Sequence, residues 1–93
     1  MAMQHVSGKK TKHIVIYALS TCPWCRKTKD LLNNLGVEYY FTDVDLESDK
    51  EKQALLGIIR KWNPATSFPT VVIDDKKCIV GFKEDEIREA VKP

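Results

Sequence analysis

Short apolar runs alternate with helix-like patterns along the 93 residues of the chain. Residues 13–19 are rich in β-branched and aromatic side chains without strict alternation, which is typical of a strand buried on both faces. A leucine stripe ending at Leu35 follows Pro23, a residue type tolerated in the first turn of a helix. We therefore expect a central strand, followed by a helix that Gly36 ends.

A second strand and a second helix are predicted in the middle of the chain. Residues 37–44 are dense in valine and aromatic residues and too short for a buried helix. Ser48 and Glu51 have the spacing of a capping box, and apolar residues recur at helical spacing over 54–62. Because a helix separates the first two strands, we expect those strands to be parallel.

The remaining pattern predicts a hairpin and a last helix. Residues 70–73 and 78–80 are apolar and flank a polar link at 74–77. An acidic segment then precedes apolar residues at helical spacing up to Val91. The predicted order is βαβαββα, an α/β domain over residues 13–93, with residues 1–12 as a flexible lead-in.

Composition and charge narrow the function further. Fifteen basic against thirteen acidic residues give a net charge of +2, spread along the chain, which argues against a nucleic-acid binder. Apolar runs are far shorter than the roughly 18 residues of a membrane span, and the first residues lack the features of a secretory signal. We expect a soluble, cytoplasmic monomer with no nucleic-acid or membrane partner.

Two of the three cysteines form a motif that carries chemistry. Cys22-Pro23-Trp24-Cys25 lies where the first strand passes into the first helix, and this spacing near a βαβ pattern indicates a thioredoxin-like redox motif. A helix N-terminus stabilises a thiolate through its free N–H groups and dipole. We therefore expect Cys22 to be the nucleophile and Cys25, one turn later, to be the resolving thiol.

Metal binding is the alternative use of the same thiolates. A structural zinc site needs two further ligands, for which the chain offers only Cys78, His5 and His13. An iron–sulfur cluster could recruit a thiol from outside the chain, so a cluster or metal carrier stays open as the competing function. Cys78 itself, on a predicted hairpin strand, is expected to be a buried small apolar residue. We predict no metal site within the chain.

Several segments together resemble the glutaredoxin family of the thioredoxin superfamily. They are Ile16-Tyr17, Cys22-Pro23-Trp24-Cys25, Ser67-Phe68-Pro69-Thr70, and Gly81-Phe82 before acidic residues. The resemblance covers residues 13–91 and implies a thioredoxin-like fold, a mixed four-stranded sheet with flanking helices. It also implies a dithiol–disulfide oxidoreductase that reduces protein disulfides or mixed disulfides, with a cis-proline beside the cysteines. The expected substrate-binding residues are Trp24, Tyr17, Phe68, Pro69, Gly81 and Phe82.

The chain departs from glutathione-using relatives at positions that bear on the electron donor. Leu19 stands where those relatives carry a basic residue, and Phe68 stands where they favour valine. The segment from Gly81 through Phe82 to Asp85 is more similar to that of NrdH-type redoxins, which are used like thioredoxins. No bound cofactor is expected, because the dithiol stores two electrons. The external reductant is either thioredoxin reductase or glutathione, and we expect glutathione to be the poorer one.

Overall fold

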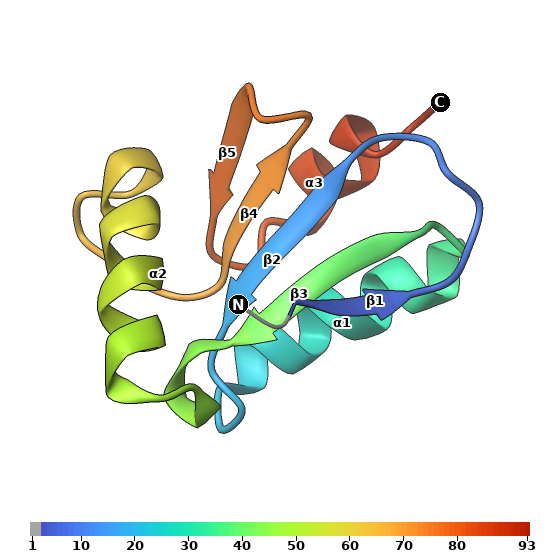
Figure 1. The fold of residues 1–93 in the computed structure, drawn as a ribbon. Coiled ribbons are helices and arrows are strands. Elements are labelled where there is room, and N and C mark those ends of the chain that lie inside the picture. The colour runs from blue at the N-terminus through green and yellow to red at the C-terminus, as the bar shows by residue number, and fades with distance from the viewer. Residues whose placement is uncertain (1–2) are drawn as a thin grey trace.

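The structure, a computed structural model, describes residues 3–93 and shows an α/β fold (Figure 1). The predicted strands and helices are all present, with small differences at their ends. One strand and one short 3-10 helix are additional. The elements are β1 (Gln4–Val6), β2 (Ile14–Ala18), α1 (Pro23–Leu35), β3 (Tyr39–Asp43), η1 (Val44–Leu46), α2 (Asp49–Trp62), β4 (Thr70–Ile73), β5 (Lys77–Val80) and α3 (Glu84–Ala90).

Within residues 3–93, the sheet has five strands in the order β1-β3-β2-β4-β5. Strands β2 and β3 are parallel, as expected, whereas β4 and β5 run antiparallel to their neighbours. The prediction of four strands is wrong, because Gln4–Val6 pairs antiparallel with β3 and covers an edge that would otherwise be open. Part of the segment predicted as a flexible lead-in, residues 1–12, is thus a strand; Met1 and Ala2 lie outside the described residues.

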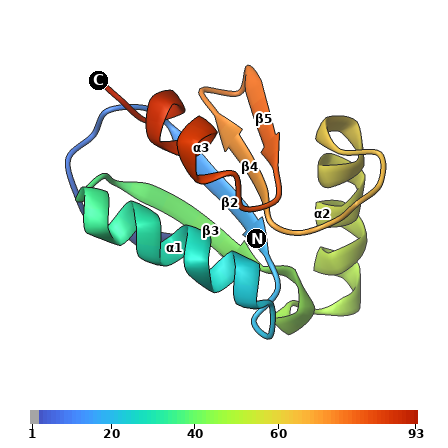
Figure 2. The same cartoon turned by 180° about the vertical axis from the view of Figure 1, so that it is seen from behind.

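Helices cover both faces of the sheet, and the central strand β2 is buried on both sides (Figures 1 and 2). Ile14, Ile16 and Ala18 pack into the core beneath α1 and α3, whereas Val15 and Tyr17 pack into the core beneath α2. Burial on both faces explains why this strand shows no alternation of polar and apolar residues.

The helix ends follow the predicted signals. Gly36 has φ 70°, a left-handed conformation that favours glycine, and it ends α1. The Ser48 hydroxyl accepts a hydrogen bond from the backbone N–H of Glu51 at 3.3 Å and begins α2. None of the helices within residues 3–93 has the length and apolar character needed to cross a bilayer.

The topology places four chain segments at one end of the strands. Because β2 and β3 are parallel, both finish at this end, and the start of α1 lies beside η1 there. Because β4 is antiparallel to β2, and β5 is antiparallel to β4, β4 begins and β5 finishes at the same end. The Cys22–Cys25 motif, the Phe68-Pro69 bond and the Gly81-Phe82 segment are therefore brought together although they are far apart in sequence.

Candidate active site

Cys22 occupies the N-terminal cap of α1. Its Sγ accepts a hydrogen bond from the backbone N–H of Cys25 at 3.2 Å, which is the position normally taken by a serine or aspartate oxygen. The side chain is half-buried, so part of it faces solvent. The sulfur therefore lies against the free N–H groups at the positive end of the helix dipole.

Cys25 is fully buried beneath Cys22, at 0% exposure. Burial is the main cause that raises the pKa of Cys25 to about 12, and the hydrogen bond and charge interaction with Cys22 add to it, while a backbone hydrogen bond with Leu19 and the charge of Lys29 act in the opposite direction. The two cysteines thus have different environments: one faces solvent, and the other is an enclosed thiol directly below it.

A partly buried ion pair lies further along α1. The Nζ of Lys29 is 2.9 Å from the Oδ1 of Asp43, and these side chains are only 20% and 17% exposed. The same ammonium lies 4.0 Å from the ring centroid of Phe41, a cation–π contact. The pair connects the helix that carries both cysteines to β3 and fixes a positive charge near them.

Two loops form a second wall beside the cysteines. The Phe68-Pro69 bond is cis, as the resemblance implied, and the backbone N–H of Gly81 donates to the carbonyl of Pro69 at 2.8 Å. Gly81 has φ 84°, which favours glycine at this turn. Phe68 and Phe82 both pack, with Cys22, against the core beneath α1 and α3.

Trp24 projects from the first turn of α1 and is 54% exposed. Its ring stacks on Phe82, with 6.1 Å between centroids and 25° between planes, and the Lys27 Nζ lies 4.7 Å from the ring centroid. The structure therefore brings five of the six expected substrate-binding residues together around Cys22: Trp24, Phe68, Pro69, Gly81 and Phe82.

The sixth expected residue, Tyr17, is not at this surface. It is 8% exposed and packs with Val72 and Leu55 in the core beneath α2, and burial is the main cause that raises its pKa. The structure thus places Tyr17 in the core, as a packing residue of the central strand, apart from the other five expected residues. Cys78 is half-buried on β5 rather than fully buried, and burial raises the pKa of its thiol.

Asp45 supports the loop before Cys22 and was not identified from the sequence. It accepts hydrogen bonds from the backbone N–H of Ser20 at 2.8 Å and from the Ser20 hydroxyl at 2.5 Å. These bonds are the main cause that lowers the pKa of Asp45. The parallel pairing of β2 and β3 was the available signal, because it places the residues that follow both strands side by side.

Replacing this carboxylate should weaken the fold in a pH-dependent way. We expect Asp45→Asn to lower the free energy of unfolding by about 1 kcal/mol at pH 7, since charged hydrogen bonds contribute most but this site is partly exposed. A lowered folded pKa stabilises above the unfolded value of about 3.9, and this stabilisation is lost as the pH falls through the folded pKa. Urea denaturation of both proteins at pH 7 and near pH 3 measures the difference, which should shrink in acid; a constant difference would contradict it.

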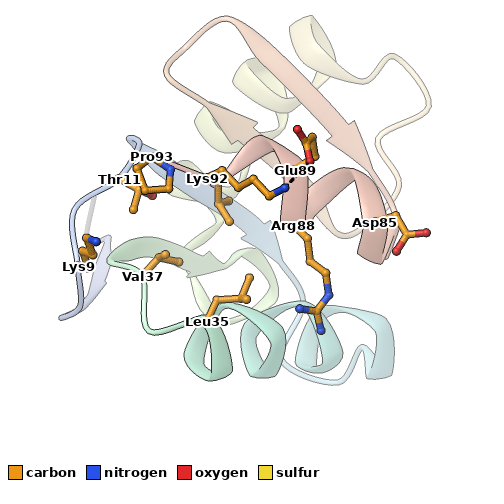
Figure 3. A pocket seen from close by; sticks show the side chains of 10 residues that line it. Lys9, Thr11, Leu35, Val37, Asp85, Arg88, Glu89, Lys92 and Pro93 are labelled. Carbon is orange, nitrogen blue, oxygen red and sulfur yellow. Dashed lines mark ion pairs between the residues drawn. The ribbon is translucent and has the colours of Figure 1, made fainter.

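A hollow of about 540 Å³ lies at the opposite end of α1 (Figure 3). Neither Cys22 nor Cys25 lines it, and the buried Thr11 hydroxyl on its wall has no hydrogen-bond partner within residues 3–93. By contrast, Cys22 lines two smaller hollows, of about 300 and 390 Å³. The surface around Cys22 and the larger hollow are therefore separate features. The larger one is lined by Lys9, Thr11, Leu35, Val37, Asp85, Arg88, Glu89, Val91, Lys92 and Pro93.

Metal ligands do not gather at the cysteines. Within residues 3–93, no group of three or more histidine, cysteine, aspartate or glutamate side chains is placed to hold a metal ion. A cluster at Cys22 and Cys25 would therefore need ligands from outside the described chain.

The chain is similar to proteins of known family. The glutaredoxin family model matches residues 14–79. A glutaredoxin-like 8.6 kDa protein from the rubredoxin operon of Clostridium pasteurianum is 35% identical over 80 residues, which cover 85% of this chain and 97% of that protein. The chain spans smaller shares, 59% and 60%, of the glutaredoxins of Vernicia fordii and Ricinus communis.

Solved structures agree with this similarity. The glutaredoxin of Methanosarcina mazei has a TM-score of 0.89 and 47% identity, over 98% of this chain and 88% of that one. Methanosarcina acetivorans methanoredoxin has a TM-score of 0.89 and 49% identity, over 91% and 90%. A buckwheat glutaredoxin in complex with glutathione has a TM-score of 0.68 and 26% identity, over 86% and 72%. The chain belongs to the glutaredoxin family, whose members are thiol–disulfide oxidoreductases.

Proposed function

We propose that the chain reduces disulfides in proteins, or mixed disulfides, through Cys22 and Cys25. The observation that supports this most strongly is the placement of the two sulfurs: a half-exposed sulfur caps a helix N-terminus, directly above an enclosed thiol. The exposed sulfur can reach a substrate disulfide, whereas the enclosed one can reach only its neighbour. Unequal access of this kind suits a two-step exchange between one attacking and one resolving thiol.

The proposed cycle consists of two successive thiol–disulfide exchanges. The Cys22 thiolate attacks one sulfur of the substrate disulfide, forms a mixed disulfide, and releases the other substrate sulfur as a thiolate, which takes up a proton. Deprotonated Cys25 then attacks the Cys22 sulfur and releases the second substrate thiol. The substrate gains two electrons, and the protein is left with a Cys22–Cys25 disulfide that an external reductant must reduce.

The environment of Cys25 influences when this thiol becomes able to attack the mixed disulfide. Burial is the largest cause that raises the pKa of Cys25, and a charged Cys22 raises it further by accepting its hydrogen bond and by like-charge repulsion. Forming the mixed disulfide removes the charge on Cys22, so both of these causes weaken and Cys25 loses its proton more readily. A substrate attached to Cys22 therefore favours ionisation of Cys25, while burial continues to raise the pKa of its thiol.

The electron donor remains a choice between two reductants. The buckwheat neighbour in complex with glutathione supports glutathione as a partner. Against efficient use of glutathione stands Leu19, which packs against the core beneath α2 and offers no cation to a ligand carboxylate. We propose that a reductase of the thioredoxin reductase class is the better donor, in the reducing environment of the cytoplasm.

A comparison of reductants tests this choice. We expect insulin reduction with glutathione, glutathione reductase and NADPH to be at least about tenfold slower than with thioredoxin reductase and NADPH. A missing charge-assisted hydrogen bond, worth roughly 1.5–3 kcal/mol, accounts for a difference of that size. Leu19→Lys is the informative variant, because it should increase the rate with glutathione selectively. Equal or faster turnover of the unmodified protein with glutathione would contradict the proposal.

A further inference from the structure

Two large apolar side chains are conspicuously exposed within residues 3–93: Trp24 at 54% and Leu46 at 71%. Single exposed apolar residues are ordinary on protein surfaces. These two, however, both lie at the end of the strands where Cys22 is found. Trp24 is in the first turn of α1, and Leu46 is the last residue of η1, which directly follows β3. Their shared location suggests a common use.

Leu46 is held beside the loop that leads to Cys22. Its neighbour Asp45 binds Ser20 through two hydrogen bonds, of 2.8 and 2.5 Å. Both ribbon views show η1, the short segment between β3 and α2, next to the turn between β2 and α1 (Figures 1 and 2). The Leu46 side chain is thus presented to solvent from a fixed position one loop away from Cys22.

The strand order places the second apolar site on the other side of Cys22. The order β3-β2-β4-β5 puts Leu46 after β3 and Phe82 after β5, with the segment leading to Cys22 between them. Trp24 stacks on Phe82, so the aromatic pair belongs to the β5 side. Three inter-strand spacings of about 4.8 Å separate β3 from β5, or about 14 Å. A small disulfide seated on Cys22 does not bridge such a span.

Basic side chains outnumber acidic ones on the surface next to Cys22. A hollow of about 390 Å³ there includes Cys22, Arg26, Lys27 and Asp30 in its wall. The Arg26 guanidinium makes no ion pair or side-chain hydrogen bond within residues 3–93, whereas Lys27 lies over Trp24. An unpaired arginine beside apolar anchors is typical of the centre of a protein–protein interface, and here it complements a carboxylate.

We propose that Leu46 and the Trp24–Phe82 pair are the two apolar anchors of a docking surface for a disulfide-bearing protein. The partner contacts both anchors at once, and it carries an acidic residue near its disulfide that faces Arg26. This inference rests on the proposed function, and it specifies the substrate class as protein disulfides rather than small ones. Leu46 is a specificity residue that touches the partner but none of the reacting sulfurs.

Steady-state kinetics with two substrates tests the proposal. For Leu46→Ser we expect KM for insulin to rise about five- to tenfold with little change in kcat, while kcat/KM for bis(2-hydroxyethyl) disulfide stays within about twofold. Leu46→Met keeps an apolar side chain and should restore most of the affinity for insulin. Lys61→Ser, an exposed change at the far end of α2, serves as the matched surface control and should alter neither substrate.

Other outcomes separate the two proposals. An unchanged insulin KM in Leu46→Ser, or an equal loss with both substrates, would overturn the docking surface and leave the oxidoreductase function intact. Failure of the unmodified protein to reduce either substrate would instead overturn the proposed function. Concentration-dependent self-association that Leu46→Ser abolishes would also overturn the proposal, because Leu46 would then be a contact between copies of this chain.

Discussion

Cys22→Ser should abolish disulfide reduction, whereas Cys25→Ser should stop the cycle after the first exchange. Cys22→Ser removes the only sulfur of the motif that reaches solvent, so the rate of insulin reduction should fall by about 10³-fold or more. Cys25→Ser leaves the attacking sulfur in place but removes the thiol that releases the product. The mixed disulfide at Cys22 should therefore accumulate.

Intact-mass measurement after mixing with bis(2-hydroxyethyl) disulfide distinguishes these variants. Cys25→Ser should gain one mercaptoethanol unit, and excess dithiothreitol should remove it, while Cys22→Ser should gain none at the motif. Cys78→Ser serves as the control, and it should behave like the unmodified protein. Equal residual activity of the two motif variants would contradict the assignment of roles.

Alkylation of the reduced protein should be strongly selective for Cys22 over Cys25. A thiol with a pKa of about 12 is ionised in only about one molecule in 10⁵ at pH 7, and Cys25 is also fully enclosed. We expect iodoacetamide to modify Cys22 at least about 100-fold faster than Cys25, as followed by peptide mass spectrometry.

The rate at which iodoacetamide modifies Cys25 should depend on pH. Because burial raises the pKa of Cys25, its modification should remain slow through pH 9 and increase only at still higher pH. Urea-unfolded protein provides the control, since there all three cysteines should react at similar rates. Comparable modification of Cys22 and Cys25 in the folded protein at pH 7 would contradict the enclosed resolving thiol.

Local signals in the sequence predict most of the fold correctly. Gly36 ends a helix because it adopts a left-handed conformation, and Ser48 begins one because its hydroxyl binds a free N–H group. Strand β1 escaped prediction because its three residues carry no clear apolar pattern and become a strand only by pairing with β3. Its existence depends on a long-range contact rather than on local preference.

In the candidate site, too, local features could be predicted from the sequence, whereas features that depend on long-range contacts could not. The Cys22–Cys25 spacing identifies the chemistry, since the motif and its helix are continuous in sequence. Asp45 was missed because its role depends on Ser20, which is 25 residues away and reaches it only through the parallel pairing of two strands. The core position of Tyr17 was not predicted, because closeness in sequence to the cysteines does not determine which face of β2 a side chain occupies.

Mapping the disulfide of the oxidised protein tests whether Cys22 and Cys25 together carry the two electrons of the reaction. The protein should be oxidised with a stoichiometric amount of disulfide, alkylated, and digested without reduction, and its peptides identified by mass spectrometry. We expect a single Cys22–Cys25 disulfide, alkylated Cys78, and two substrate thiols released per protein molecule. A disulfide that includes Cys78, or oxidation without any Cys22–Cys25 linkage, would contradict it.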